Sequence, residues 1–372
     1  MKKLKVAKIV GTRPEIIRLS RLIPKLDEHT DHILVHTGQN SDPKLNNVFF
    51  EDLELRQPDY FLNVDTSSMG SVMGDVLKKS EEVFLKEKPD AVMILGDTNS
   101  SIAAIVAERM HIPVYHMEAG NRSFDNNVPE ELNRKMVDHV ASFNLPYNDY
   151  SMRNLLAEGI HPRFMQKTGS PIREIYEHYK GKIQSSAAVA DLGLTPGGYF
   201  LVSVHRQENV DLPERLGNVV DCLAAVRDEW GLPIIVSTHP RTRIRLEALG
   251  RKDLEGVNFH EPFGYLDYNK LQLEAKCVIS DSGSISEESA IAGFRAVSLR
   301  DSSERPEAIE AGTIILSGLD VPNLLRSLPL SISETPRTTL PDGYDEQAFS
   351  VRVLNFVTST ATNHKAWKGI LF

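Results

Sequence analysis

The chain alternates short apolar runs with longer stretches in which apolar positions recur at helical spacing. The short runs, rich in β-branched residues, lie at 6–10, 32–37, 91–95, 113–117, 199–204, 233–237, 276–280 and 296–299. Helical spacing follows the first of them from Ile16 to about Leu26, and the third from about Ser100 to Met110. Strands that alternate with helices in this way predict parallel sheets covered by helices, the α/β class.

The alternation is interrupted once and then starts again. Between about Gly169 and Gly198 the chain is rich in serine, proline and glycine, which is typical of a junction between two halves. We therefore expect an N-terminal domain over 1–169 and a second domain over 170–354. A last helix is predicted from about Glu346 to Thr358.

Composition supports two ordinary globular domains. The chain has 372 residues, 41% of them hydrophobic and 25% charged. Its formal net charge of −9 argues against binding nucleic acid, which needs a surplus of cations to neutralise phosphates. No apolar run approaches the roughly 20 residues that span a bilayer, and the N-terminal sequence does not resemble a signal peptide. We expect no membrane partner and a cytoplasmic location.

The two cysteines fit this expectation. Cys222 and Cys277 form no CxxC pair and no zinc-ligand spacing. They are predicted to be reduced thiols, as is usual in the cytosol. Cys277 lies in a predicted strand, where a buried thiol is the expected state.

The loop after the first predicted strand has the residues of an anion site. Gly11-Thr12-Arg13-Pro14-Glu15 combines a guanidinium with the free N–H groups of a helix start. Pro14 suits the first helical position. The alternative is an ordinary capped turn.

A second loop of this kind follows the predicted strand 276–280. Ser282 and Gly283 are small enough for the backbone to approach a phosphate, and a helix follows at once. Glu288, further along that helix, could accept hydrogen bonds from two ribose hydroxyls, or could simply serve the helix dipole. Neither GxGxxG nor GxxxxGK[ST] occurs, so no dinucleotide fingerprint and no P-loop is predicted.

Other polar candidates lie at or just after strand ends. Asp97, Glu118 and Glu130 in the first half could exchange protons with a substrate, or could be unrelated surface acids. His205, in the second half, could face them and act in catalysis, or could be structural. Arg305 lies where phosphates could bind, but a solvated arginine paired with a neighbouring glutamate is the favoured alternative.

Two other chemistries lack their sequence signatures. The histidines form no compact metal-ligand set, and there is no GxSxG nucleophile elbow. The residues alone therefore predict a nucleotide or nucleotide-sugar site with proton-transfer chemistry, and neither a metal nor a cofactor.

An ordered set of motifs between residue 11 and about residue 318 resembles the non-hydrolysing UDP-N-acetylglucosamine 2-epimerases. In chain order these motifs are Gly11-Thr12-Arg13-Pro14-Glu15, Gly96-Asp97-Thr98, His116-Met117-Glu118-Ala119-Gly120, Pro129-Glu130-Glu131 with Asn133-Arg134, Thr168-Gly169-Ser170-Pro171, His205-Arg206-Gln207-Glu208-Asn209, Asp281-Ser282-Gly283, Glu287-Glu288 and Glu304-Arg305-Pro306-Glu307. Each motif is modest alone, but the ordered set is highly specific.

The resemblance implies two Rossmann-like domains facing a cleft, as in the B-type glycosyltransferases. It also implies that the C-terminal helix, about 355–372, returns to the first domain. The implied reaction inverts C-2 of a UDP-2-acetamido sugar: UDP is eliminated to give a 2-acetamidoglycal and is then added back. It needs no redox cofactor, and a homodimer is expected by resemblance alone.

The same resemblance assigns roles to individual residues. Asp97, Glu118 and Glu130 match the catalytic carboxylates, and His205 matches a histidine near the diphosphate. The remaining matches are expected to bind UDP or the sugar: Arg13, Arg18, Arg134, Ser282, Gly283, Glu288 and Arg305.

Two departures from the common family pattern narrow the expectation. Arg18 stands where the common form has lysine, and Asn40-Ser41-Asp42 replaces residues that serve an allosteric substrate site. The motifs Gly120-Asn121-Arg122 and Val137-Asp138-His139 resemble the capsule and O-antigen subgroup instead. That subgroup converts UDP-2-acetamido-2,6-dideoxy-L-talose into UDP-N-acetyl-L-fucosamine, which is the first substrate expected here.

Three alternatives stay open. The first is epimerisation of UDP-N-acetylglucosamine to UDP-N-acetylmannosamine. The second, from another class, is a B-type glycosyltransferase, and the third is a hydrolysing relative that releases free sugar.

Overall fold

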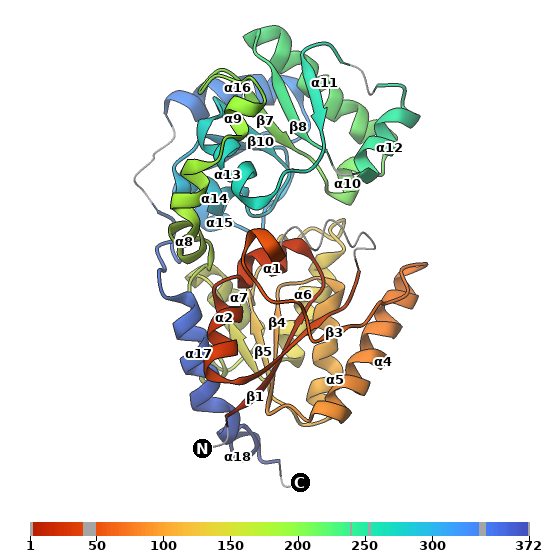
Figure 1. Ribbon diagram of the computed structural model, residues 1–372, viewed down its shortest axis with the longest axis vertical. Coiled ribbons are helices and arrows are strands. Elements are labelled where there is room, and N and C mark those ends of the chain that lie inside the picture. Colours follow the sequence, from red (N-terminus) through yellow and green to blue (C-terminus); the bar gives the residue numbers. More distant parts are fainter. Residues whose placement is uncertain (1–2, 40–49, 239, 252–253, 335–339, 371–372) are drawn as a thin grey trace. The chain divides into compact units, whose positions relative to one another are not determined.

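The computed structural model describes residues 3–39, 50–238, 240–251, 254–334 and 340–370. The chain divides into two compact units (Figure 1). Unit 1 comprises Met1–Ile175 together with Asp345–Phe372, and unit 2 comprises Tyr176–Tyr344.

Unit 1 is built on a parallel sheet with the strand order β3-β2-β1-β4-β5-β6. Its strands are β1 (Lys5–Val10), β2 (Asp31–His36), β3 (Tyr60–Phe61), β4 (Ala91–Leu95), β5 (Val114–Met117) and β6 (Phe143–Leu145). Its helices are α1 (Arg13–Leu19), α2 (Leu22–His29), α4 (Met69–Glu87), η1 (Asn99–Ile102), α5 (Ala103–Arg109), α6 (Glu130–Val140), α7 (Asp149–Ala157), η2 (Pro162–Phe164), α17 (Phe349–Thr360), η3 (Ala361–Asn363) and α18 (His364–Lys368). Helix α8 (Ile172–Ser185) runs from unit 1 into unit 2.

Unit 2 repeats this architecture, with the order β12-β11-β10-β7-β8-β9, again parallel. Its strands are β7 (Phe200–Ser203), β8 (Ile234–Ser237), β9 (Val257–His260), β10 (Cys277–Ser280), β11 (Ala296–Ser298) and β12 (Ile315–Leu316). Its helices are α9 (Ala188–Asp191), α10 (Gln207–Val210), α11 (Pro213–Trp230), α12 (Pro240–Ala248), α13 (Tyr265–Glu274), α14 (Ile285–Ala292), α15 (Pro306–Glu310) and α16 (Val321–Ser333).

Both sheets are covered on both faces, which explains why their strands are continuous apolar runs. In unit 2 successive residues enter different cores. Phe200 and Val202 of β7 pack with helix α11 and helix α16 residues in one cluster, whereas Leu201 packs in the cluster on the opposite face. Each unit has the strand order of the Rossmann fold, so the predicted α/β class with two Rossmann-like halves is confirmed.

The eight predicted strands match observed strands within one residue at each end, whereas β3, β6, β9 and β12 were not predicted. The first predicted helix does not match. A single helix was expected from Ile16 to about Leu26, whereas the structure has α1 and α2 separated at Ser20 and Arg21. Pro24 gives the physical reason, because it has no N–H for the Ser20 carbonyl and its ring collides with the carbonyl four residues earlier. At the C-terminal end of α2, the Leu26 carbonyl oxygen accepts from Thr30 N.

The end of the chain packs on unit 1. Helix α17 lies against α2 (Figure 1), and the Tyr115 hydroxyl lies 2.6 Å from Thr360 Oγ1. Ser350 N donates to Glu174 at 2.9 Å. The helix expected to begin near Glu346 begins at Phe349, and a short helix, α18, follows it.

Two further expectations concern burial and membranes. Cys222 and Cys277 are both free thiols and both buried, as expected, and burial raises the pKa of Cys277 to about 12. Among the described residues, no helix combines the length and the apolar character that crossing a bilayer requires.

Candidate active site

Five of the eleven candidate residues follow the strands at which each sheet reverses its order. In each unit the first and fourth strands are neighbours, β1 beside β4 and β7 beside β10. From the first strand the chain continues toward one side of the sheet, and from the fourth strand it continues toward the other side. Ligands of open α/β sheets bind outside the carboxyl ends of such strands. In unit 1 this edge carries Arg13 and Asp97, and in unit 2 it carries His205, Ser282 and Gly283.

A buried glutamate shapes the loop after β1. Glu15 Oε2 accepts from Gly11 N at 3.0 Å and from Thr12 Oγ1 at 2.9 Å, and Ser100 Oγ lies 3.2 Å from Glu15 Oε1. Lys8 is fully buried nearby, and burial lowers its pKa to about 7, while burial raises the pKa of Glu15. Glu15 therefore fixes the entry into α1 rather than facing a ligand.

Arg13 and Glu130 each open a helix. Arg13 is the first residue of α1 and Glu130 is the first residue of α6, and both are half-buried. Glu130 was expected at or just after a strand end, and this is wrong. A connection from Glu118 to Pro129 separates it from β5, so its backbone position is the first turn of a helix, which favours an acid.

Asp97 is held by an arginine of α6. Arg134 donates to Asp97 Oδ2 through Nε at 3.0 Å and Nη2 at 2.5 Å, and its Nη1 donates to Glu131 at 2.8 Å. Asn133 Nδ2 donates to the Asp97 carbonyl at 3.0 Å. The Arg134 side chain is buried and that of Asp97 is about 29% exposed, so the acid stays reachable while its charge is compensated.

Glu118 is held in the same way by an arginine of α1. Arg18 Nη1 lies 2.8 Å from Glu118 Oε2, and both side chains are largely buried. Asn121 Nδ2 donates to Glu118 Oε1 at 3.3 Å. Glu118 has a left-handed backbone, with φ +64°, which is uncommon for a residue with a side chain. A Cβ at Gly96 would be 3.4 Å from Glu118 Oε2, so the turns after β4 and β5 lie side by side.

The sequence singled out Asp97, Glu118, Arg18 and Arg134, but it did not show which of them contact one another. Arg18 and Arg134 were expected to bind substrate, and the structure places each on a candidate carboxylate. Glu131 and Asn133 were not singled out as functional. Glu131 and Arg134 are three apart on one helix face, a spacing from which their pairing could have been predicted.

In unit 2 a buried aspartate joins the ends of β7 and β10. Asp281 accepts from His205 N at 3.1 Å, Arg206 N at 3.0 Å and Asn209 Nδ2 at 3.0 Å. His205 Nδ1 lies 3.3 Å from Asp281 Oδ1, and the His205 side chain is 49% exposed. Asp281 therefore orients the imidazole while leaving it open to solvent.

Gly283 has no side chain, and a carboxylate occupies the space that a side chain would need. A Cβ there would be 2.4 Å from Glu304 Oε1 and 3.2 Å from Arg206 Nη2. Arg300 Nη1 lies 2.5 Å from Glu304 Oε2. The glycine thus makes room for an ion-pair cluster beside the start of α14, which sequence reasoning had not foreseen.

Glu288 is hydrogen-bonded inside unit 2. It accepts from Ser284 Oγ at 2.5 Å and from Gln272 Nε2 at 2.8 Å, and it is half-buried on α14. Both of its oxygens are thus oriented by neighbouring donors.

Arg305 is not the solvated loop residue that was favoured. It is buried, and its Nε and Nη2 donate to Glu287 Oε2 at 3.2 and 3.1 Å. It lies just before α15 while Glu287 is on α14, so the pair ties the two helices together. Nearby, Tyr344 donates to Glu307 Oε1 at 3.0 Å, and burial raises the pKa of Glu307 to about 7.

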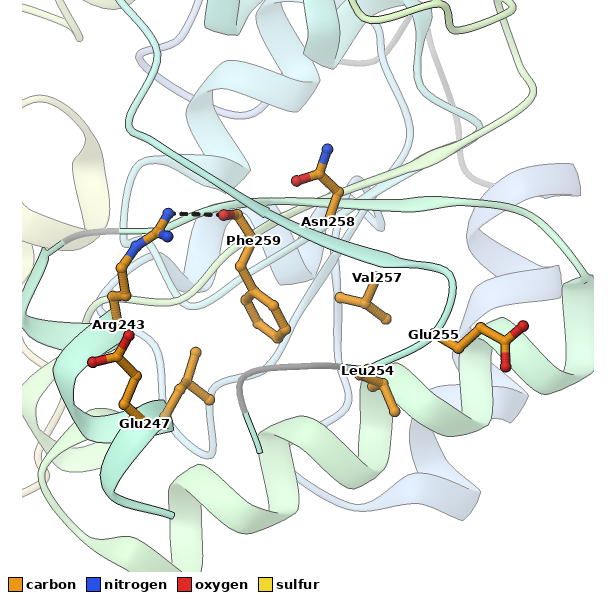
Figure 2. Close-up of a pocket in the computed structure, with 8 residues that line it drawn as sticks. Arg243, Glu247, Leu254, Glu255, Val257, Asn258 and Phe259 are labelled. Atoms are coloured by element: carbon orange, nitrogen blue, oxygen red, sulfur yellow. Dashed lines mark hydrogen bonds between the residues drawn. The ribbon is translucent and has the colours of Figure 1, made fainter. Parts of the chain in front are cut away.

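Other features lie outside this arrangement. A pocket of about 610 Å³ occurs at the edge of the unit 2 sheet, between α12 and β9, and it contains none of the predicted residues (Figure 2). Arg243 closes it on one side by donating to the Phe259 carbonyl at 2.9 Å. In the described part of the chain no cluster of three histidine, cysteine or acidic side chains could hold a metal ion. Asn40-Ser41-Asp42 lies outside the described residues.

The chain is similar to a known family in sequence and in fold. A family model described as UDP-N-acetylglucosamine 2-epimerase matches residues 24–357. A UDP-N-acetylglucosamine 2-epimerase of Methanocaldococcus jannaschii is 36% identical over 363 residues, 95% of this chain and 99% of the relative. A UDP-2,3-diacetamido-2,3-dideoxy-D-glucuronate 2-epimerase of Pseudomonas aeruginosa is 33% identical over 337 residues, covering 89% and 93%.

Solved structures agree. That of a UDP-N-acetylglucosamine 2-epimerase from Rickettsia bellii superimposes with a TM-score of 0.90 at 42% identity, covering 98% of this chain and 99% of the other. The Methanocaldococcus jannaschii enzyme in complex with UDP-GlcNAc and UDP also gives 0.90, at 35% identity, covering 96% and 100%. The chain therefore belongs to the UDP-N-acetylglucosamine 2-epimerase family and is an isomerase.

Proposed function

We propose that the protein is a non-hydrolysing C-2 epimerase of a UDP-2-acetamido sugar. The observation that carries this proposal is the pair of acids on adjacent turns, each matched by its own arginine: Asp97 with Arg134, and Glu118 with Arg18. Two compensated carboxylates from separate turns suit a reaction that takes a proton from one face of a carbon and returns it to the other.

The proposed chemistry balances without a redox cofactor. A carboxylate takes the C-2 proton, the electrons form a C-1=C-2 double bond, and the C-1–O bond breaks with its electrons on the leaving phosphate oxygen of UDP. The intermediate is a 2-acetamidoglycal. UDP then adds back to C-1, and a proton is delivered to the opposite face of C-2. Glu130 completes the proposed set of catalytic acids.

Residues of each unit are proposed to contact UDP. In unit 2, Gly283 offers its backbone N–H to phosphate just before α14, and Ser282, whose own N–H donates to Ser280 Oγ at 3.0 Å, offers its hydroxyl. In unit 1, Arg13 offers a guanidinium. His205, oriented by Asp281, stabilises the departing oxyanion. Glu288 accepts from the ribose hydroxyls.

Arg305 takes a different role in this proposal. Its guanidinium donates to Glu287 of α14, so we assign it to positioning that helix.

The proposed substrate is UDP-2-acetamido-2,6-dideoxy-L-talose, which gives UDP-N-acetyl-L-fucosamine. The support is that residues of the capsule and O-antigen subgroup pattern contact Glu118 or pair with one another close to it in the chain. Asn121 donates to Glu118, and Arg122 Nη1 donates to Asp138 Oδ2 at 2.7 Å. Epimerisation of UDP-N-acetylglucosamine is the second candidate, favoured by the names of several relatives.

Product analysis with both UDP-sugars tests the proposal. We expect the purified protein to convert the deoxytalose sugar into its C-2 epimer and to release almost no free sugar. Conversion of UDP-N-acetylglucosamine alone would replace the first substrate with the second. Release of free 2-acetamido sugar would indicate a hydrolysing enzyme, and turnover only with an added acceptor would indicate a glycosyltransferase.

A further inference from the structure

His116 is a fully buried histidine whose two ring nitrogens both face acceptors. It lies in β5, two residues before Glu118, and its side chain has no exposed area. Its Nε2 lies 2.9 Å from the carbonyl oxygen of Gly96, and its Nδ1 lies 2.9 Å from Oδ1 of Asp138. A carbonyl oxygen can only accept, so Nε2 carries a hydrogen.

The second acceptor is a carboxylate that several donors hold in place. Asp138, also fully buried, accepts from Gly120 N at 3.1 Å and from Arg122 Nη1 at 2.7 Å. His116 Nδ1 lies 2.9 Å from the same carboxylate, so the imidazole packs directly against the group that holds Gly120.

Arg122 connects Asp138 to a second acid. It also donates to Glu158 through Nε at 2.8 Å and Nη2 at 2.5 Å. The Asp138 carboxylate is therefore held by a guanidinium that another carboxylate fixes in turn. His139 Nδ1 lies 3.9 Å from Glu158 and is half-exposed.

The two glycines held by this cluster flank the candidate acids. Gly96 comes directly before Asp97, and Gly120 comes two residues after Glu118. Both have left-handed backbones, with φ +67° and +82°. Their turns pack side by side, because a Cβ at Gly96 would be 3.4 Å from Glu118 Oε2.

We propose that His116 is a positioning residue: by bridging Gly96 and Asp138, it locks the turn that carries Asp97 to the turn that carries Glu118. The assignment rests on the proposed function, because that function makes these two carboxylates catalytic. The lock acts through the backbone, so its loss moves the acids relative to one another without removing either.

Two conservative variants each keep one of the two contacts of His116 and remove the other. In His116→Asn the amide nitrogen takes the place of Nδ1 and keeps the contact with Asp138, whereas in His116→Gln it takes the place of Nε2 and keeps the contact with Gly96. We expect kcat to fall by about 10- to 100-fold in both variants, since a displacement of about 1 Å has effects of this size. KM for the UDP-sugar should stay within about twofold, because the residues proposed to bind UDP are elsewhere.

His364→Gln is the matched control. His364 is also a buried histidine of unit 1, but it contacts Ser142 near the C-terminus, and burial lowers its pKa to about 4. We expect its kcat to equal that of the wild type. Folded His116 variants that keep the wild-type kcat would overturn the proposal.

A spectroscopic readout tests the lock without depending on turnover. In protein labelled with ¹⁵N-histidine, we expect one residue to show an Nε2 proton that exchanges slowly with solvent, because this nitrogen is buried and faces the Gly96 carbonyl oxygen. This signal should be absent from His116→Gln. A His116 ring without a proton on Nε2 would overturn the proposal even if the variants failed to fold. Absence of epimerisation by the wild type would instead overturn the proposed function, while the spectrum would still decide whether the cluster exists.

Discussion

At the scale of single residues, Glu118 combines backbone strain with a compensated charge. A left-handed conformation costs a residue with a side chain about 1–3 kcal/mol, and here φ is +64°. The ion pair with Arg18 and the bond from Asn121 hold the carboxylate in place. Strain of this kind is concentrated at functional sites, and it coincides here with an acid proposed to be catalytic.

Glu307 shows a different kind of buried acid, and its effect on stability depends on pH. Burial raises its pKa from 4.5 to about 7, so the folded protein holds this proton more tightly than the unfolded chain does. Between these two values the folded state binds more protons, and stability therefore falls as pH rises. Above about pH 7 the full cost is present, at most about 3 kcal/mol.

We therefore expect Glu307→Gln to remove this loss. Glutamine stays neutral and still offers an oxygen to Tyr344. The melting temperature of the variant should rise relative to that of the wild type as pH increases from about 4.5 to about 7.5. Thermal unfolding at a series of pH values measures the difference, with exposed Glu310→Gln, on the same helix, as the control. Parallel curves for wild type and Glu307→Gln would contradict the account.

At the scale of elements, the strands could be predicted because they are buried on both faces. A continuous apolar run such as Ala91–Leu95 is visible in the sequence, and it coincides with β4. The break between α1 and α2 could also have been read from Pro24, but the apolar periodicity continues across it. The short strands β3 and β12, of two residues each, have too little pattern to detect.

The candidate site could be predicted only as far as its positions along the chain. Residues that follow neighbouring parallel strands gather at one edge of a sheet, and Asp97 and Glu118 follow the neighbours β4 and β5. Their partners depend on side-chain contacts between distant segments, such as Arg18 with Glu118 and Arg134 with Asp97. Spacing along the chain carries no such information.

Two glycine-to-alanine substitutions are expected to change stability in opposite directions, one in a turn and one inside a helix. In Gly120→Ala the new methyl group would lie 2.3 Å from the Ser151 carbonyl oxygen, at φ +82°. We expect a loss of more than about 1 kcal/mol of unfolding free energy. In Gly181→Ala, inside α8 with open space around it, we expect a gain of about 0.5–1 kcal/mol. Urea unfolding compares the two, and equal effects would contradict this explanation.

At the scale of the whole molecule, two units of the same strand order divide the proposed labour. Unit 1 presents the arginine-paired acids after β4 and β5, and unit 2 presents a helix start and an oriented histidine after β10 and β7. The proposed proton-transfer acids thus belong to unit 1, and the residues proposed to bind UDP belong to unit 2 except for Arg13.

The central claim is that the protein exchanges the C-2 proton of a UDP-2-acetamido sugar. Proton NMR in deuterium oxide tests it directly, with UDP-2-acetamido-2,6-dideoxy-L-talose and UDP-N-acetylglucosamine in separate tubes. We expect the C-2 proton signal of the deoxytalose sugar to disappear while the epimer, deuterated at C-2, accumulates. Retention of the C-2 proton in both sugars, with folded protein present, would contradict the account.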